Sequence, residues 1–515
     1  MRTHWDEETD VIVVGYGLAG AVAAINAHDA GVDVMILEKG RYPGGLSIFS
    51  GGIMIGSYDA DAANKYLLRT SGGRVDTALV NLIAHEMVGL EQYLRELAEV
   101  NNAKLNTKNL KDRPATYFGG SGHNEWAYPF EGWDSFYIIT VAQIPGFKGR
   151  VPWAQPTRSP AVNLMKIAMD NVKVRQIKVR FSSPAKRLVT DKSGTVMGTI
   201  FETAGKEIAV RARRAVILSC GGFEQNQWLH KQYFQGMPYY SMAPLTHTGD
   251  GLIMAQKVGA ALWHMWHIHG SYGFKFPEFN IAFRHPLGGS RNPKHLIPWI
   301  VVDKLGRRYM NEYHPAPADT NHRPMEIFDP DIPGYPRIPS YMIFDELGRK
   351  QGPIARPRDY ERVYKWSKDN MKEVKKGWIM KEHSLRDLAQ RIAITEDNEN
   401  MMKAENLEAT IFNWNSVVRS GKDQLNRPAG TMTRIETAPF YAVPVWPIIT
   451  NTQGGPVHNA KRQVIDAFGS PIPRLYTAGE LGSFWAHLYL LGGNLSECIW
   501  SGRIAGINAA RESIC

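Results

Sequence analysis

Residues 10–39, DVIVVGYGLAGAVAAINAHDAGVDVMILEK, constrain the fold of this 515-residue chain more than any other stretch. The apolar run at 11–14 predicts a buried strand, residues 21–30 predict a helix, and residues 32–37 predict a second strand. A strand, a helix and a second strand within about 30 residues form a βαβ unit, the building block of a parallel sheet covered by helices. The chain is therefore expected to open with an α/β domain.

A glycine-rich loop with the spacing GxGxxG joins the first strand to the helix. It comprises Gly15, Tyr16, Gly17, Leu18, Ala19 and Gly20. Glycines at these positions let the turn close and let a pyrophosphate reach the N-terminus of the helix. Glu38 follows the second strand, at the place where a carboxylate accepts a hydrogen bond from a ribose hydroxyl. The loop and the carboxylate together predict a nucleotide site.

A second cluster of glycines directly after Glu38 favours FAD over NAD. The segment KGRYPGGLSIFSGG occupies 39–52 and includes Lys39, Gly44, Gly45, Leu46, Ser47, Gly51 and Gly52. FAD is the longer cofactor and needs more close backbone contact, whereas an NAD site does not require glycines at this point. We therefore expect these residues to contact FAD.

The segment 39–52 resembles the second FAD segment, GG(S/T)xxSGG, of the fumarate reductase and 3-ketosteroid dehydrogenase superfamily, with slightly different internal spacing. Further segments resemble motifs of the same superfamily and lie at 182–198, 214–226, 246–262, 306–312, 471–483 and 490–506. The resemblance implies additional FAD contacts from Ala185, Cys220, Gly221, Gly222, Asp250, Gly479, Glu480, Gly493, Asn494, Leu495 and Ser496. Cys220 stands where threonine is usual, either as a small buried residue or as a reactive thiol.

This resemblance implies an α/β fold in which a Rossmann-like FAD-binding domain carries an inserted α+β capping domain. We expect the FAD-binding domain at 1–265 and 440–515 and the substrate-capping domain at 266–439, where prolines, aromatics and charges increase. No second GxGxxG follows a strand, so a pyridine-nucleotide domain is not expected, and no metal site is indicated. Succinate dehydrogenases attach flavin through a histidine that 44–52 lacks, so we expect non-covalent FAD.

Two positions argue against a dicarboxylate substrate. Fumarate reductases clamp carboxylates with the histidine of HxTMGG and the arginine of NRLGGN, but Asn451 and Leu490 stand at these places. The C-terminal motif HLYLLGG is closer to the HSYPGxG of 3-ketosteroid dehydrogenases, which puts Tyr489 on their tyrosine and Gly493 on their assisting glycine. A phenol and a backbone N–H can together bind one ketone oxygen and favour its enolate. The alternative is that Tyr489 is a packing aromatic near the flavin.

Several residues are candidates for proton transfer. Ketosteroid dehydrogenases carry a tyrosine in NExxPY, but NEYHPAPAD has Ala316 at that position, which leaves Tyr313 and His314 as substitutes. Arg349 falls near the arginine that delivers a proton in fumarate reductases. Further candidates are Tyr128 and His269. A structural role is an alternative for each of these residues.

Composition limits the partners and the location. The net charge is +10, but no basic and aromatic nucleic-acid module accompanies it, so we expect no nucleic-acid partner. Lysines and two tryptophans interleave at 365–381, which predicts either a solvated helix face or an interfacial helix in peripheral contact with a membrane. Three cysteines without a CxxC pair, and an N-terminus without an apolar signal segment, predict a reducing, cytoplasmic location.

The sequence thus predicts an FAD-dependent oxidoreductase that acts on a C–C bond next to a ketone, most plausibly as a 3-ketosteroid (Δ1 or Δ4) dehydrogenase-like enzyme. A hydride would move to or from flavin N5 while a proton moves at the adjacent carbon, and an unidentified electron acceptor or donor would complete the cycle. The aromatic residues of 118–136 suit a hydrophobic polycyclic ketone, or equally a core. One alternative is a flavin ene-reductase of an unsaturated acid or enone, with a carboxylate clamp from Arg349, Arg284 or Arg291. Another is a flavin-holding protein without turnover.

Overall fold

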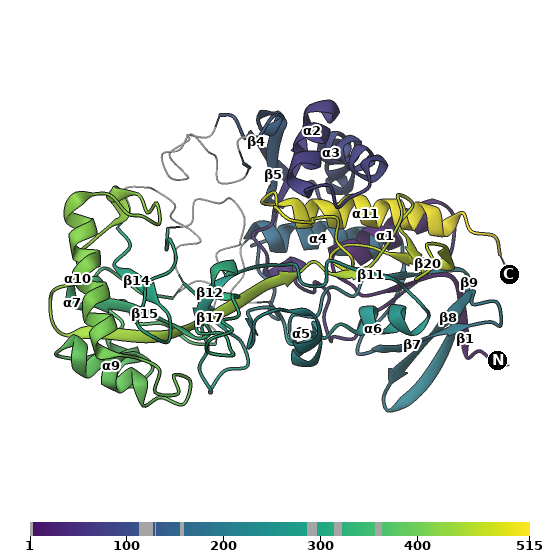
Figure 1. Cartoon of the computed structure of the whole chain (residues 1–515). Helices are drawn as coiled ribbons and strands as arrows, with labels where there is room; N and C mark the ends of the chain where they lie inside the picture. The colour runs from purple at the N-terminus through teal and green to yellow at the C-terminus, as the bar shows by residue number, and fades with distance from the viewer. Residues whose placement is uncertain are drawn as a thin grey trace.

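Strand β1 (Glu7–Val14) lies inside the larger of the two main sheets of the molecule (Figure 1). The structure is a computed structural model that describes residues 4–112, 127–128, 130–154, 159–285, 296–313, 322–355 and 363–514. This sheet has eight strands, in the order β19–β20–β9–β1–β2–β6, and β8 and β7 continue from β9 as an antiparallel extension. Its other strands are β2 (Val34–Leu37), β6 (Lys178–Arg180), β7 (Ala185–Thr190), β8 (Val196–Thr203), β9 (Lys206–Leu218), β19 (Gln463–Ile465) and β20 (Pro471–Thr477).

The predicted βαβ unit is confirmed. Strands β1 and β2 pair in parallel with Val11 opposite Val34, and helix α1 (Leu18–Asp29) connects them. The residues of β1 from Thr9 onward are buried, as expected of a strand with both faces covered. The helix begins at Leu18, three residues earlier than predicted, because the end of the glycine loop already forms its first turn with Gly17 as the N-cap.

The last helix of the chain returns to the first one. Helix α11 (Gly493–Ala510) packs against α1, and Figure 1 shows it in yellow beside α1 and α4 (Ser159–Val174). Glycines allow the close contact: a Cβ on Gly502 would lie 2.6 Å from the carbonyl oxygen of Ala19, and one on Gly506 would lie 2.3 Å from that of Ala23. The N-terminal and C-terminal parts of the chain therefore build one domain.

A small three-stranded sheet and two helices pack next to this domain. The antiparallel strands are β3 (Ile53–Ser57), β5 (Phe136–Gln143) and β4 (Lys104–Asn109), in that order. Helices α2 (Ala60–Ser71) and α3 (Thr77–Ala98) begin at Asp59 and Asp76, whose side chains accept backbone N–H groups of the first turn. Ser496 of α11 accepts the N–H of Ile55 at 2.7 Å, which ties the small sheet to the C-terminal helix.

The second main sheet has seven strands and is organised around the 13-residue strand β17 (Phe440–Thr452). Its main path is β13–β12–β17–β15–β14, and β10 and β16 also pair with β17. The bounds of these strands are β10 (Tyr240–Ser241), β12 (Ile268–Phe274), β13 (Phe283–Arg284), β14 (Trp299–Val302), β15 (Ser340–Asp345) and β16 (Met380–Glu382). In Figure 1 β17 runs from the end of the seven-stranded sheet near α9 (Leu385–Ala393) and α10 (Ala404–Ser420) toward the eight-stranded sheet.

This arrangement confirms the α/β fold class with a Rossmann-like domain and a second α+β part. Two strands of the seven-stranded sheet lie outside the predicted capping segment 266–439, since β10 precedes residue 266 and β17 begins at residue 440. The exact boundaries expected at 265/266 and 439/440 therefore stay predictions. Among the residues that the structure describes, no helix combines the length and the apolar character that a membrane span requires.

Residues 365–381 form neither of the two helices considered for this segment, the solvated helix and the interfacial helix. Within this segment only α8 (Met371–Lys375) is helical, and Trp366 and Trp378 are 5% and 8% exposed. Both rings pack in the core of the second sheet, where the ring of Phe276 stacks on Trp378 at 4.3 Å. The lysines stay at the surface, and Lys376 Nζ lies 4.7 Å from the Trp378 ring. Buried aromatics with solvated lysines between them give the same sequence pattern as an interfacial helix.

Candidate functional site

A pocket of about 810 Å³, which includes space that opens to solvent, lies where three parallel strands end. Gly15, Ser219 and Ala478 directly follow β1, β9 and β20, and all three line this pocket. The crevice at the carboxyl ends of the strands is the usual ligand site of an open α/β sheet.

The three motif glycines have three different roles at this pocket. Gly15 has a φ of +107°, and a Cβ there would lie 2.4 Å from the carbonyl oxygen of Ser219. A Cβ on Gly20 would lie 2.0 Å from the carbonyl oxygen of Gly15, so this glycine allows helix and strand to pack closely. Gly17 faces the pocket, and the nearest atom to a Cβ there would be Ser47 Oγ at 3.8 Å. Gly17 thus leaves room for an anion at the N-terminus of α1, where free N–H groups point.

Acidic and basic side chains line the next part of the pocket. Glu38 accepts the N–H groups of Tyr16 at 2.7 Å and of Gly40 at 2.6 Å, which fixes its carboxylate at the pocket wall. Each carboxylate oxygen keeps a second lone pair, so Glu38 can still accept a ribose hydroxyl. Lys39 and Asp250 both line the pocket and form an ion pair, with Lys39 Nζ 2.7 Å from Asp250 Oδ2.

The pocket brings together most of the residues predicted to bind FAD. These are Gly15, Gly17, Leu18, Ala19, Glu38, Lys39, Gly45, Leu46, Ser47, Ala185, Cys220, Gly221, Asp250, Gly479 and Glu480. The predicted residues that do not line it are Gly20, Gly44, Gly51, Gly52, Gly222, Gly493, Asn494, Leu495 and Ser496. Several of these glycines serve packing instead, since a Cβ on Gly52 would lie 2.1 Å from the N of Ala161 and one on Gly493 would lie 2.1 Å from the Trp485 ring.

Other lining residues were not predicted. They are Val14, Tyr16, Leu37, Ser219, Thr246, His247, Met254, Ala478 and Cys498. Most of them are sequence neighbours of predicted residues at the strand ends. His247 lies three residues before Asp250, and Cys498 lies one helical turn after Asn494, so the spacing around known motifs was the available signal.

Two half-buried cysteines line the pocket. Burial raises the pKa of Cys220 to about 12, and burial also raises the pKa of Cys498. Cys220 Sγ lies 3.4 Å from the carbonyl oxygen of Val14, and a Cβ on Gly251 would lie 2.8 Å from that sulfur. Because the thiolate is the reactive form, these values favour the small buried residue over the reactive thiol at Cys220.

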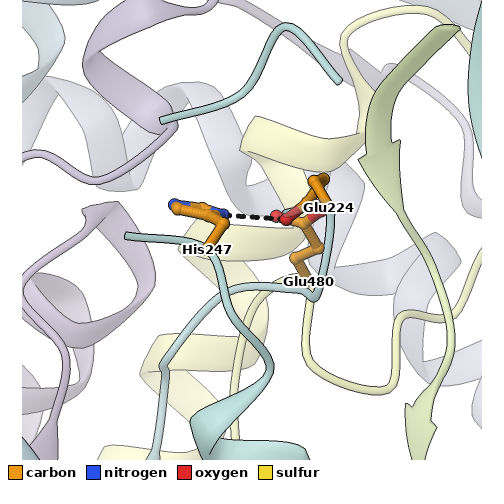
Figure 2. Close-up of side chains that lie close together, drawn as sticks. All are labelled: Glu224, His247 and Glu480. Atoms are coloured by element: carbon orange, nitrogen blue, oxygen red, sulfur yellow. Dashed lines mark hydrogen bonds and ion pairs between the residues drawn. The ribbon is translucent and has the colours of Figure 1, made fainter. Parts of the chain in front are cut away.

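Glu224, His247 and Glu480 converge beside the pocket, as Figure 2 shows. One potential ligand atom of each lies within 4.8 Å of those of the other two. Burial and the negative charge of Glu224 raise the pKa of Glu480. Burial opposes ionisation of Glu224 too, but a hydrogen bond with Glu480 and the charge of His247 lower its pKa overall. The two pKa shifts run in opposite directions, as expected of two neighbouring carboxyl groups that do not both ionise.

Tyr489 lies in a separate buried cluster next to this region. The side chain is 8% exposed, and its phenol oxygen accepts the N–H of Gly492 at 2.9 Å. The N–H of Gly493, which was expected to assist it, instead donates to the carbonyl oxygen of Leu490 at 2.8 Å. The glycine whose N–H contacts the phenol oxygen of Tyr489 is thus Gly492 and not the predicted Gly493. Tyr489 belongs to a buried cluster of aromatic and aliphatic side chains, which also contains Tyr66, Phe136, Phe484, Trp485 and Leu490.

His269 is the polar neighbour of Tyr489, with ring centroids 4.0 Å apart. Its Nδ1 lies 2.9 Å from Gln453 Nε2 and 3.3 Å from Asn494 Nδ2. An amide nitrogen only donates, so Nδ1 accepts and the ring proton resides on Nε2. His269 is therefore a neutral imidazole with an N–H donor, held by amides from two other segments of the chain.

The remaining candidates lie elsewhere or outside the described residues. Tyr313 is buried in the core of the second sheet, and Tyr128 packs at the edge of the Tyr489 cluster. Arg284 pairs with Gly273, four residues along β12 from His269, or roughly 13 Å at the rise of a strand. His314, Ala316 and Arg291 lie outside the described residues.

Arg349 lies far from Tyr489. Helix α7 (Glu346–Lys350) follows β15, whose Asp345 pairs with Phe440, whereas His269 pairs with Asn451. Positions 440 and 451 are eleven residues apart on β17, roughly 36 Å. Arg349 instead forms a two-point ion pair with Glu346, at 2.7 and 2.8 Å.

The open space above Gly17, the N-terminus of α1 and the carboxylate of Glu38 fit the pyrophosphate and ribose of a dinucleotide, and the pocket extends beyond them to Glu480. These features define a nucleotide-binding flavoprotein of the Rossmann type. The chain belongs to the family described as FAD binding domain, which matches residues 10–495. It is an FAD-dependent oxidoreductase, and the resemblance identified from its motifs is confirmed.

Relatives include both branches of the predicted superfamily. A probable fumarate reductase of Shewanella frigidimarina is 25% identical over 99% of this chain and 76% of its own. A 3-oxosteroid 1-dehydrogenase of Mycolicibacterium smegmatis is 25% identical over 98% of this chain and 97% of its own. The crystal structure of 3-ketosteroid Δ1-dehydrogenase from Sterolibacterium denitrificans, in complex with 1,4-androstadiene-3,17-dione, shares the fold with a TM-score of 0.76 and 21% identity, covering 98% of this chain and 99% of that one.

Proposed function

We propose that this flavoprotein adds or removes two hydrogens across a C–C bond next to a ketone, with a 3-ketosteroid or a similar polycyclic ketone as its substrate. The observation that carries this proposal is the pairing of Tyr489 with His269 in a buried, largely apolar cluster. Bound FAD supplies the hydride chemistry at its N5 position. The residues of the chain must then bind the ketone oxygen and manage a proton.

Tyr489 and His269 provide two donors for one oxygen. The phenol oxygen of Tyr489 accepts the N–H of Gly492, and in this proposal its O–H donates to the ketone oxygen when a substrate is bound. The N–H of His269 at Nε2 is the second donor. Two donors aimed at a ketone oxygen stabilise the negative charge that develops when the adjacent carbon loses a proton. Gly493 contributes by its lack of a side chain, which lets Trp485 pack behind Tyr489.

The candidate ketone site and the FAD pocket share one short stretch of backbone. Thr452 donates its N–H to Glu224 at 2.8 Å, beside the pocket, while the next residue, Gln453, holds His269. The Cα atoms of consecutive residues are about 3.8 Å apart. The backbone at Thr452, beside the cofactor pocket, is therefore directly followed by Gln453, which holds His269 in the candidate ketone site. A substrate held by Tyr489 would therefore lie close to the cofactor.

Charge favours a ketone over a dicarboxylate. Asn451 and Leu490 replace the two clamp residues of fumarate reductases, and neither carries a charge. Arg349 lies too far along the sheet to replace them. The aromatic surface around Tyr489 suits a hydrophobic ring system.

One observation favours an ene-reductase as a second candidate. Arg323 Nη2 donates to the carbonyl oxygen of His487, two residues before Tyr489. Burial lowers the pKa of Arg323, but an arginine still stays protonated near neutral pH. This cation could bind one carboxylate of an unsaturated acid in the same cluster.

Anaerobic flavin bleaching distinguishes these candidates. The purified yellow protein is mixed without oxygen with a panel of saturated and Δ4 3-ketosteroids, and the visible absorbance of the flavin is followed. Rapid bleaching by one steroid, with loss of two hydrogens in the product, supports the ketone proposal. If no steroid bleaches the flavin, and an unsaturated acid reoxidises the reduced protein, the ketone proposal is wrong and the ene-reductase holds. If neither happens, the chain binds flavin without turnover of either substrate class. A second substrate must exchange electrons with the flavin in the other half-reaction, and we expect this reaction in the cytoplasm. The same absorbance assay with candidate electron acceptors and donors identifies that substrate.

A further inference from the structure

His247 is a buried imidazole at the wall of the FAD pocket that no motif predicted. It is 5% exposed and lies directly before the turn that leads into α6 (Asp250–Lys257). The ring rests on Gly221, since a Cβ at that glycine would lie 2.8 Å from His247 Cε1. The absence of a side chain at position 221 therefore makes the space that the imidazole fills.

One nitrogen of the ring is fixed by a carboxylate. His247 Nδ1 lies 3.1 Å from Glu224 Oε2, and Glu224 is fully buried (Figure 2). The other oxygen of Glu224 accepts the N–H of Thr452 at 2.8 Å and its hydroxyl at 3.1 Å. Both oxygens of Glu224 are thus engaged. Its role is to orient the imidazole and to accept the Nδ1 proton.

The other nitrogen faces the place expected for the phosphates. A Cβ built on Gly45 would lie 3.8 Å from His247 Nε2 and 3.7 Å from the Cα of Gly17. His247 Nε2 therefore stands across a small open space from the N-terminus of α1. It makes no hydrogen bond within the part of the chain that the structure describes, and a polar atom so placed is oriented for a ligand.

We propose that His247 binds the cofactor by donating a hydrogen bond from Nε2 to the FAD pyrophosphate, with Glu224 as its positioning residue. Since Nδ1–H already donates to Glu224, a donor at Nε2 requires the protonated imidazolium. FAD binding and protonation of His247 are thereby linked: the anionic pyrophosphate stabilises the cation, and the cation strengthens the binding of FAD.

The surrounding charges are compatible with an imidazolium at this place. Glu224 and Glu480 converge beside the ring, and Glu38, Lys39 and Asp250 line the same pocket, where Lys39 and Asp250 form an ion pair. Burial and the negative charge of Glu224 raise the pKa of Glu480, which favours its neutral form next to the phosphates. Glu224 contacts the ring directly at 3.1 Å and can balance an imidazolium charge.

Affinity for FAD tests this role without an activity assay. Apoprotein is titrated with FAD, and the dissociation constant is obtained from the change in flavin fluorescence. His247→Gln keeps an N–H donor but cannot become charged, and we expect it to bind FAD about tenfold or more weakly, as the loss of a charge-assisted hydrogen bond implies. His85→Gln, on the exposed face of α3, is the matched control and should bind FAD like the unmodified protein. Binding by His247→Gln within about twofold of the unmodified protein near pH 6.5 would overturn the assignment.

A second measurement follows the phosphates directly. The ³¹P signals of FAD are recorded in the reconstituted unmodified protein, in His247→Gln and in the control His85→Gln. We expect His247→Gln to shift both signals, because the hydrogen bond from Nε2 is lost, and His85→Gln to leave them unchanged. Identical signals in all three proteins would show that His247 does not contact the pyrophosphate, and His247 would then be a packing residue. Failure of the unmodified apoprotein to bind FAD at all would instead contradict the family assignment.

Discussion

The ring of Tyr489 lies against the ring of His269, with centroids 4.0 Å apart and planes inclined by 32°. Tyr489 belongs to the loop that precedes α11, and His269 belongs to strand β12 of the second sheet. The two residues meet only because the second sheet is docked on the FAD-binding part. The candidate ketone site is therefore a product of the whole fold and not of either part alone.

Replacement of Tyr489 by phenylalanine tests the phenol as a carbonyl donor. We expect turnover to fall by about 10²–10³, the usual cost of removing one donor to a developing oxyanion, while flavin content stays full. Tyr441→Phe removes a phenol hydroxyl in the same way. Tyr441 lies at the start of β17, whereas the end of β17 is the part close to His269, so this variant should leave turnover nearly unchanged. Stopped-flow measurement of flavin reduction checks both variants, and an undiminished rate in Tyr489→Phe would remove the residue from the mechanism.

Arg349 is expected to be a structural residue. Arg349→Gln breaks its two hydrogen bonds to Glu346, so we expect the free energy of unfolding to fall by about 2 kcal/mol. The rate of flavin reduction by substrate should change by no more than about twofold. Urea unfolding and stopped-flow kinetics measure the two quantities. A loss of about 100-fold in rate at full stability would instead assign Arg349 to proton delivery.

Gly20 and Gly89 form a matched pair of helix glycines. A Cβ on Gly20 would lie 2.0 Å from a backbone oxygen, so Gly20→Ala should destabilise the protein by about 1–3 kcal/mol or more and weaken FAD retention. Gly89, in the exposed middle of α3, has no atom within 4 Å of a built Cβ, and Gly89→Ala should stabilise by about 0.5–1 kcal/mol. Thermal unfolding and the ratio of flavin to protein absorbance report both effects. Equal stability of the two variants would contradict the close packing of α1 on β1.

Acid should destabilise the protein through His230. Burial lowers the pKa of this imidazole from 6.5 to about 4, so the unfolded chain binds its proton first as the pH falls. The contribution of His230 to stability is therefore present above pH 6.5 and is lost as the pH falls toward 4. Between neutral pH and pH 5 this loss amounts to about 2 kcal/mol. His230→Gln keeps a donor for the carbonyl oxygen of Phe223 and should show a pH dependence smaller by that amount in urea unfolding, whereas the exposed His85→Gln should not.

Acid precipitation should release the flavin into solution. The side chains at the described pocket that could form a bond to a flavin are His247, Cys220 and Cys498. Burial raises the pKa of both cysteines, which keeps them as unreactive thiols, and Glu224 holds one nitrogen of His247. We therefore expect the supernatant to contain all of the flavin, as measured by absorbance. Flavin that stays with the protein pellet would demonstrate a covalent bond.

The nucleotide site could be predicted from the sequence because its parts are local. Gly15, Gly17 and Glu38 belong to one βαβ unit, and backbone geometry alone brings them to the carboxyl edge of the sheet. The prediction failed where contacts are made across the fold. The spacing of His247 from Asp250 indicates only that it lies near the pocket, whereas the orientation of its ring depends on Glu224 and Gly221 from another segment.

The misinterpretation at 365–381 has a related cause. Trp366 and Trp378 are buried against Phe276 and its neighbours, which come from a strand and loop about ninety residues earlier. Sequence alone records that lysines and tryptophans alternate, but it does not record which surface covers the tryptophans. The Gly493 N–H likewise donates to Leu490 because the turn before α11 closes on itself, a detail of backbone geometry that a motif does not contain.

Strand β17 begins beside Asp345 at the outer end of the second sheet and ends at Thr452, whose N–H donates to Glu224 near the cofactor pocket. No loop interrupts these 13 residues. A displacement of the second sheet along this strand is therefore carried toward Thr452 and Gln453. The pairing of β17 with β12 is irregular at Thr450, where a β-bulge separates the long regular stretch from the backbone that contacts Glu224 and His269. Relative motion of the two parts would concentrate at this bulge, directly beside the candidate ketone site and the cofactor wall.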